Sequence, residues 1–222
     1  MSGFKEVFKE NEKVVLPIII ADSFKIARDK TQIALDSGAD GIFLRKEGSA
    51  DFAKVNGWVA KLRKNSDKFI GIYHPELRPA EIFRHHPQSS GVLVDCTEIR
   101  ESISRNNKKY FIITREAEEI EAEKVKSGWQ GLYFGGINFP NEPMVKELDY
   151  FAYNASKYVD VLVAAGNPAD IGNIRISIAS DFPLAVINIT PEDVGKYKDK
   201  VNCFIIADIR VRDFVSAVKA SL

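Results

Sequence analysis

Residues 183–207 read PLAVINITPEDVGKYKDKVNCFIIA and contain one complete strand–helix–strand unit. The two ends, PLAVI and CFIIA, are almost entirely apolar, as expected for strands that are buried on both faces. Between them, Pro191–Lys198 is polar and begins with proline, a residue that is well tolerated at the start of a helix. This pattern predicts two parallel strands joined by a right-handed crossover.

The same alternation of apolar runs and longer amphipathic stretches extends over the whole chain. The apolar runs are Pro17–Ala21, Gly41–Leu44, Phe69–Tyr73, Gly91–Cys96, Gly131–Gly136, Asp160–Gly166, Pro183–Ile187 and Cys203–Ala207. Eight such units in 222 residues predict an α/β protein with one domain, a (β/α)8 or TIM barrel. A doubly wound open sheet is the structural alternative.

One segment interrupts this rhythm between the fourth and fifth runs. Residues 97–116 contain an additional apolar run, YFIIT, at Tyr110–Thr114. We interpret the segment as an insertion in the loop after strand four; the alternative is that YFIIT is a ninth strand of an open sheet. As an exposed apolar element, the insertion would also offer a pairing surface for a homodimer.

Composition limits the classes of function. The chain has 31 basic and 31 acidic residues, and this zero net charge argues against a nucleic-acid partner. Its two cysteines fit a reducing compartment, and the polar N-terminal segment MSGFKEVFKENEK is no secretory signal, so we expect a cytoplasmic protein. The longest apolar run, Val14–Ala21, is too short for an integral membrane segment.

Two residues at strand ends are predicted to carry chemistry, because ligands of such barrels bind at the C-terminal ends of the strands. Asp95 directly follows the apolar GVLV, so its carboxylate needs a partner, a cation or a raised pKa. A salt bridge to Arg45 or Lys46 would be the simpler explanation. His74 is the only histidine at a strand end, and its ordinary pKa near neutrality suits proton transfer. We therefore expect Asp95 and His74 to be the catalytic residues.

Polar residues after the other strands form the expected ligand-binding set. They are Asp22, Lys46, Asn138, Asn167, Asn188, Thr190 and Asp208. No group of His, Cys and carboxylates has metal-ligand spacing, and no motif identifies a cofactor. The phosphate site of such barrels uses backbone N–H groups after strands seven and eight. Neither end has a glycine here, and Asp208 brings a negative charge, so a phosphate is disfavoured at this place.

Four segments of the chain resemble the BtpA family of TIM-barrel proteins. They are GADGIFL, GLYFGG, VDVLVAAG and DFPLAVINITPEDVGKYKDKVNCFIIA, in a register from about Ile18 to Ala207. The resemblance implies a TIM barrel related to phosphate-binding enzymes. The founding member is linked to photosystem I biogenesis, and a relative lies among carbohydrate-metabolism genes. No catalytic residues come with the resemblance.

The departures from the family pattern fall at the strand ends. Ile187 and Asn188 stand where the family usually has Ser-Gly, and Asp208 and Ile209 stand where it has Thr-Gly. We therefore expect a small polar metabolite, sugar- or nucleoside-like, with or without a phosphate, bound at the C-terminal face. The alternative is a non-catalytic pseudoenzyme that acts as an assembly or interaction module. Its barrel mouth would be filled by its own side chains.

Overall fold

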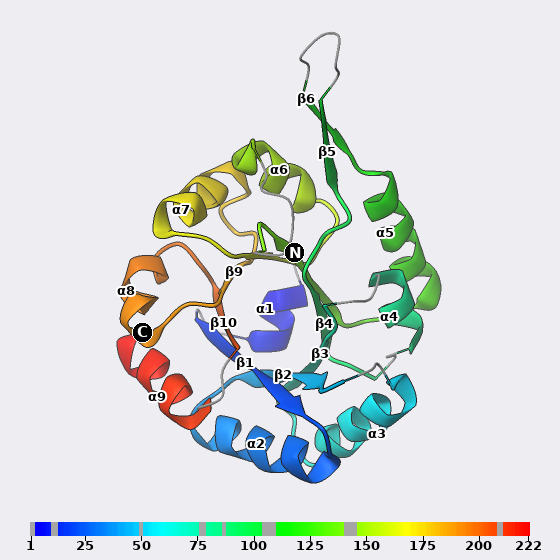
Figure 1. The fold of residues 1–222 in the computed structure, drawn as a ribbon, viewed down its shortest axis with the longest axis vertical. Coiled ribbons are helices and arrows are strands. Elements are labelled where there is room, and N and C mark those ends of the chain that lie inside the picture. The colour runs from blue at the N-terminus through cyan, green and yellow to red at the C-terminus, as the bar shows by residue number, and fades with distance from the viewer. Residues whose placement is uncertain are drawn as a thin grey trace.

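The structure is a computed structural model that describes residues 3–9, 13–48, 51–75, 79–85, 88–103, 110–139, 146–207 and 211–222. Parallel strands close into a barrel in the order β1-β10-β9-β8-β7-β4-β3-β2 (Figure 1). These strands are β1 (Val14–Ala21), β2 (Gly41–Lys46), β3 (Phe69–Tyr73), β4 (Gly91–Val94), β7 (Leu132–Ile137), β8 (Val161–Ala164), β9 (Leu184–Ile187) and β10 (Cys203–Ala207). Each overlaps one predicted run, so the barrel is confirmed and the open sheet was wrong.

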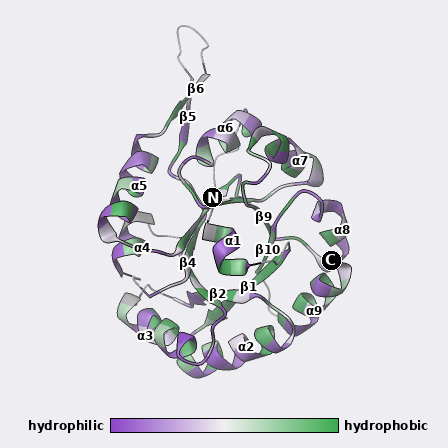
Figure 2. Ribbon diagram, turned by 180° about the vertical axis from the view of Figure 1, so that it is seen from behind, coloured by the Kyte–Doolittle hydropathy of each residue, from purple (hydrophilic) through white to green (hydrophobic). Residues whose placement is uncertain are grey.

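Helices surround the barrel and follow its strands along the chain. They are α2 (Phe24–Asp36), α3 (Phe52–Arg63), α4 (Pro79–His85), α5 (Arg115–Ser127), α6 (Leu148–Ala155), α7 (Pro168–Ser177), α8 (Val194–Tyr197) after a 3-10 turn (Pro191–Asp193), and α9 (Val211–Ser221). They carry both hydrophobic and hydrophilic residues, as amphipathic helices do (Figure 2). Ser23 caps α2 and accepts a hydrogen bond from the Ile26 amide. Within the described ranges, no helix is long and apolar enough to cross a bilayer.

The barrel interior is packed with side chains that recur at every second position of the strands. On β1 these are Val14, Leu16 and Ile18, and aromatic rings from other strands meet them. The rings of Phe43 and Phe134, for example, lie 5.0 Å apart in an edge-on arrangement. Because successive side chains of a strand point to opposite faces, the next members of each series face the C-terminal opening of the barrel. We call this opening the mouth.

A short helix that sequence analysis missed, α1 (Gly3–Phe8), closes the N-terminal end of the barrel. Phe4 and Phe8 are each 5% exposed and belong to the interior cluster. The ring of Phe8 lies 5.2 Å from that of Phe69, the first residue of β3. In Figure 1, α1 lies within the ring of strands. The polar appearance of this segment concealed two phenylalanines four residues apart, which share one face of a helix.

The predicted insertion is a β-hairpin outside the barrel. Its strands β5 (Arg100–Ile103) and β6 (Tyr110–Ile113) pair antiparallel, with Arg100 opposite Ile113. The hairpin projects beyond the ring of helices (Figure 1). At its base, the Glu101 carboxylate accepts a hydrogen bond of 2.9 Å from the Lys146 amide. Because α5 already begins at Arg115, the insertion ends two residues earlier than predicted.

Candidate functional site

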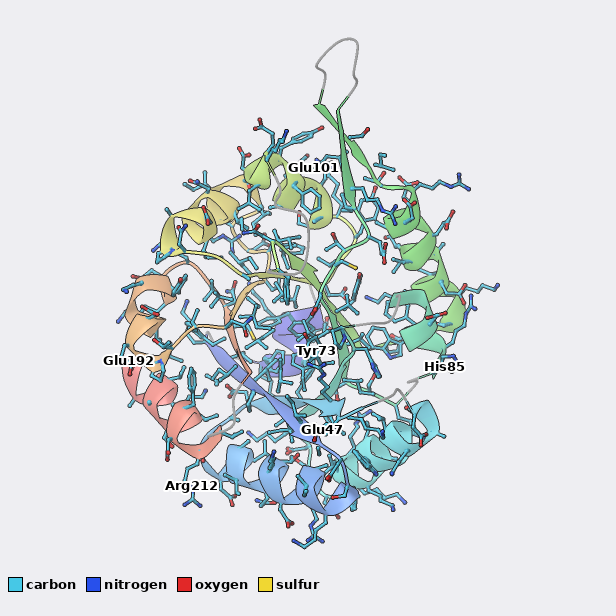
Figure 3. All side chains as sticks on the ribbon, in the orientation of Figure 1. Glu47, Tyr73, His85, Glu101, Glu192 and Arg212 are labelled. Atoms are coloured by element: carbon cyan, nitrogen blue, oxygen red, sulfur yellow. The ribbon has the colours of Figure 1, made fainter. Side chains whose placement is uncertain are left out.

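Three polar residues from neighbouring strands meet at the mouth. Arg45 lies on β2, Tyr73 ends β3 and Asp95 directly follows β4. Each continues the inward series of its strand, in step with the interior residues Phe43, Phe69 and Leu93. The Tyr73 hydroxyl donates a hydrogen bond of 2.7 Å to Asp95 Oδ1. The guanidinium carbon of Arg45 lies 5.4 Å from the centre of the Tyr73 ring. Tyr73 lies near the centre of the ring of strands in Figure 3.

Partial burial sets the protonation of this group. Burial raises the pKa of the Asp95 carboxyl above its ordinary value, while the Tyr73 hydrogen bond and the charge of Arg45 act in the opposite direction. Burial and the neighbouring Asp95 raise the pKa of Tyr73 above its ordinary value, which already lies well above neutral pH. Tyr73 is therefore a permanent hydrogen-bond donor, and Asp95 is a carboxyl whose pKa is moved toward neutrality, as suits proton exchange.

The salt bridge considered for Asp95 is absent among the described residues. The ion pairs there include neither Asp95 nor Arg45. Lys46 instead directs its ammonium group to the Glu47 carbonyl oxygen, at 3.2 Å. Asp95 is thus held by the tyrosine hydroxyl, because Arg45 stacks on the tyrosine ring rather than reaching the carboxylate.

His74 lies beside this group in the sequence but differs from it in environment. It is 8% exposed, and its backbone N–H donates to the Leu93 carbonyl, which extends the pairing of β3 with β4. Strand alternation directs its side chain away from the inward series to which Tyr73 belongs. Burial, followed by the charge of Arg45, lowers the pKa of His74 to about 4. The imidazole is therefore neutral at physiological pH.

Several residues of the predicted ligand-binding set form hydrogen bonds within or between the loops at the strand ends. Asn138, with a left-handed φ of 58°, donates its side-chain amide to the Ala165 carbonyl at 3.0 Å. Asn167 caps α7 by accepting from the backbone amides of residues 169 and 170. Thr190 precedes the 3-10 turn, and its hydroxyl donates to the carboxylate of Asp193 at 3.1 Å. These contacts fix the loops after β7, β8 and β9.

The remaining predicted residues are exposed or lie outside the described part of the chain. Asp22 and Asn188 are exposed, and Asn188 has a left-handed φ of 61°. Asp208, and with it the phosphate argument made for that strand end, lies outside the described residues. Within the described part of the chain, no three His, Cys, Asp or Glu side chains are grouped so that they could hold a metal ion.

Two apolar residues that the sequence interpretation left out shape the mouth. Ile20 of β1 is 39% exposed although its strand is otherwise buried, and it is paired in register with Arg45. Phe139, after β7, is 5% exposed and packs over Gly136, where an added Cβ would lie 2.5 Å from its ring. Strands β1 and β7 lie opposite each other in the ring. The mouth is thus filled on the β7 side and accessible at Ile20.

Tyr73 and Arg45 were visible in the sequence but were not chosen as site residues. Tyr73 was counted as the end of an apolar run, and Arg45 only as a salt-bridge partner. Counting by twos along FIGIY from Phe69, or along GIFLR from Phe43, places both on the inner face. The missing information was which alternate set of residues faces the barrel interior.

Comparisons with known proteins support the architecture. No protein-family model and no curated protein matches the chain. Tryptophan synthase subunit alpha from Legionella pneumophila superposes with a TM-score of 0.69 at 11% identity, over 100% of this chain and 98% of that one. The (S)-3-O-geranylgeranylglyceryl phosphate synthase from Thermoplasma acidophilum, in complex with its substrate sn-glycerol-1-phosphate, gives 0.66 at 10% identity, over 100% and 98%. At such identities the likeness establishes the TIM-barrel fold alone.

Proposed function

We propose that this protein is an enzyme that binds a small polar metabolite at the mouth and exchanges a proton with it through Asp95. The observation that carries the proposal is the hydrogen bond of 2.7 Å from Tyr73 to Asp95 on the inner face of the barrel. One oxygen of the carboxyl group is fixed by this bond. The other oxygen accepts no hydrogen bond from the described residues and is proposed to meet the ligand, as general acid–base catalysis requires.

The properties of the two candidate proton-transfer groups favour Asp95 over His74. Burial raises the pKa of Asp95 toward neutrality, whereas it lowers that of His74 to about 4, so the imidazole is a weak base. Tyr73 acts as a positioning residue, because it orients the carboxyl group. We propose further ligand contacts from Asp22, Lys46, Asn138, Asn188 and Asp208.

The class of ligand is proposed on chemical grounds. Carboxylate, amide and ammonium groups around one opening suit a hydroxylated compound such as a sugar or a nucleoside. The substrate of one structural neighbour, sn-glycerol-1-phosphate, is a small hydroxylated anion of this kind. We also propose that the chain is a divergent member of the BtpA family, on the four segments quoted above.

The test is a panel of sugars, sugar phosphates and nucleosides, screened by ligand-detected NMR and then for conversion. Asp95→Asn is expected to abolish conversion of any compound that binds, while the melting temperature stays nearly unchanged. The matched control Asp213→Asn, on the exposed face of α9, should behave as the wild type. A large loss of stability in Asp95→Asn with unchanged ligand binding would contradict the proposal.

A second candidate function is the non-catalytic interaction module. The observation that favours it is the burial of Phe139 over Gly136, which fills part of the mouth with the protein's own side chain. This candidate predicts that no compound of the panel binds, and that Asp95→Asn and Asp213→Asn are indistinguishable. A homodimer formed through the β5–β6 hairpin stays a prediction, which light scattering on a hairpin deletion would check.

A further inference from the structure

The Arg45 guanidinium has an unusual environment for a half-buried cation. It stacks on Tyr73, but no hydrogen bond or ion pair to any described residue satisfies its N–H groups. Side chains of this type are seldom buried without a partner, because removing the charge from water is unfavourable. The five donors of a guanidinium form a rigid fork that matches two oxygens of a carboxylate or a phosphate. The Arg45 guanidinium therefore has the chemistry of an oxyanion-binding group.

The neighbour of Arg45 across the β1–β2 ladder is apolar and accessible. Ile20 is paired in register with Arg45, and both belong to the inward series of their strands. Its 39% exposure is the exception in a strand whose other residues are buried. An anion held by Arg45 on β2 would thus have the hydrocarbon side chain of Ile20 on its β1 side. The Tyr73–Asp95 pair, at the ends of β3 and β4, would lie on its other side. This arrangement suits a short carbon skeleton that ends in an oxyanion.

We infer that Arg45 anchors an oxyanion group, carboxylate or phosphate, of a ligand whose carbon skeleton packs on Ile20. The inference rests on the proposed function, which it narrows from polar metabolites to small organic anions. It places the anion at the end of β2, and not at the ends of β9 and β10, where barrels usually bind phosphate. This alternative location agrees with the absence of glycine from INITPEDV, after β9. Arg45 binds the anion while Asp95, held by Tyr73, remains available for proton transfer.

Two probe anions separate the possible sources of the oxyanion. Butyrate supplies a carboxylate with a short carbon chain, and inorganic phosphate supplies the phosphate alone. Each is titrated at constant ionic strength while the Nε–H signal of Arg45 is followed by NMR. We expect saturable binding of at least one probe to the wild type and a loss of affinity of at least tenfold in Arg45→Gln. The probe that binds more tightly assigns the oxyanion as carboxylate or phosphate.

Two further variants keep the test decisive. Arg212→Gln removes the same charge from an exposed position on α9, far from Tyr73 in the view of Figure 3, and should bind as the wild type. Arg45→Lys keeps the charge but loses the fork, so it should fold and bind with intermediate affinity. Unchanged binding in Arg45→Gln, or an equal loss in Arg212→Gln, would overturn the inference. Arg45-dependent binding combined with full activity of Asp95→Asn would refute only the proposed proton transfer.

Discussion

Replacing Gly136 by alanine tests the packing that holds Asp95 in place. Gly136 lies on β7 where this strand runs beside the end of β4. A Cβ added at this position would come within 2.4 Å of the Asp95 carbonyl oxygen and 2.5 Å of the Phe139 ring. Phe139 can turn away, but the carbonyl belongs to the backbone that follows the paired strand β4. The two strands would therefore have to move apart.

The expected cost follows from these two contacts. Overpacking of a close-packed site typically costs about 1–3 kcal/mol. Since one of the clashing atoms is backbone, we expect Gly136→Ala to lower the free energy of unfolding by about 2–3 kcal/mol. For a domain of this size, such a change lowers the melting temperature by roughly 6–9 °C.

The measurement is urea denaturation followed by circular dichroism, with Gly57→Ala as the matched control. Gly57 lies within α3 and has no atom within 4 Å of an added Cβ, so alanine should stabilise the helix by about 0.5–1 kcal/mol. The two glycine substitutions should thus have opposite signs. The accuracy of such comparisons is about 0.5 kcal/mol. If the free energy of unfolding of Gly136→Ala agrees with that of the wild type within this accuracy, the close approach of β7 to Asp95 is wrong.

Phe8→Ala should destabilise the protein by about 3 kcal/mol in urea denaturation, because it removes a ring from the closed N-terminal end of the barrel. The control Val7→Ala, at a position 41% exposed on the same helix, should change the free energy of unfolding by less than about 0.5 kcal/mol. Equal effects of the two substitutions would refute the role of α1. The pKa of His74 is lowered from 6.5 to about 4, so the unfolded chain binds a proton that the folded protein rejects between these values. Stability should therefore fall as the pH drops from about 6.5 to about 4, and His74→Gln should flatten this dependence; identical pH profiles would contradict it.

The barrel could be predicted because its strands are buried on both faces. Such strands appear as continuous apolar runs, so their number and order follow from the sequence, as at PLAVI and CFIIA. The short helix α1 could not be predicted in this way, because a helix of one or two turns forms by packing against the barrel rather than by its own propensity.

The site could be predicted only in part, for a related reason. The position of Asp95 follows from the end of an apolar run, but its hydrogen bond to Tyr73 depends on the register between β3 and β4. A continuous apolar run carries no alternation, so it does not reveal which residues face inward. Asn138 and Asn167 illustrate the opposite limit, because polar residues at strand ends also hold loops. Asn138 bonds the neighbouring loop after β8, and Asn167 bonds its own.

The pairing of β1 with β10 has a consequence for how the chain reaches its native state. Val14 lies beside Cys203 and Ile18 beside Ala207, so the seam joins the first and the last strand of the barrel. During synthesis the first strand must wait for the last one to leave the ribosome, and until then both apolar edges are unprotected. Ring closure is therefore the step at which two unfinished molecules can exchange strands, and crowding of nascent chains should lower the yield of correctly closed barrels.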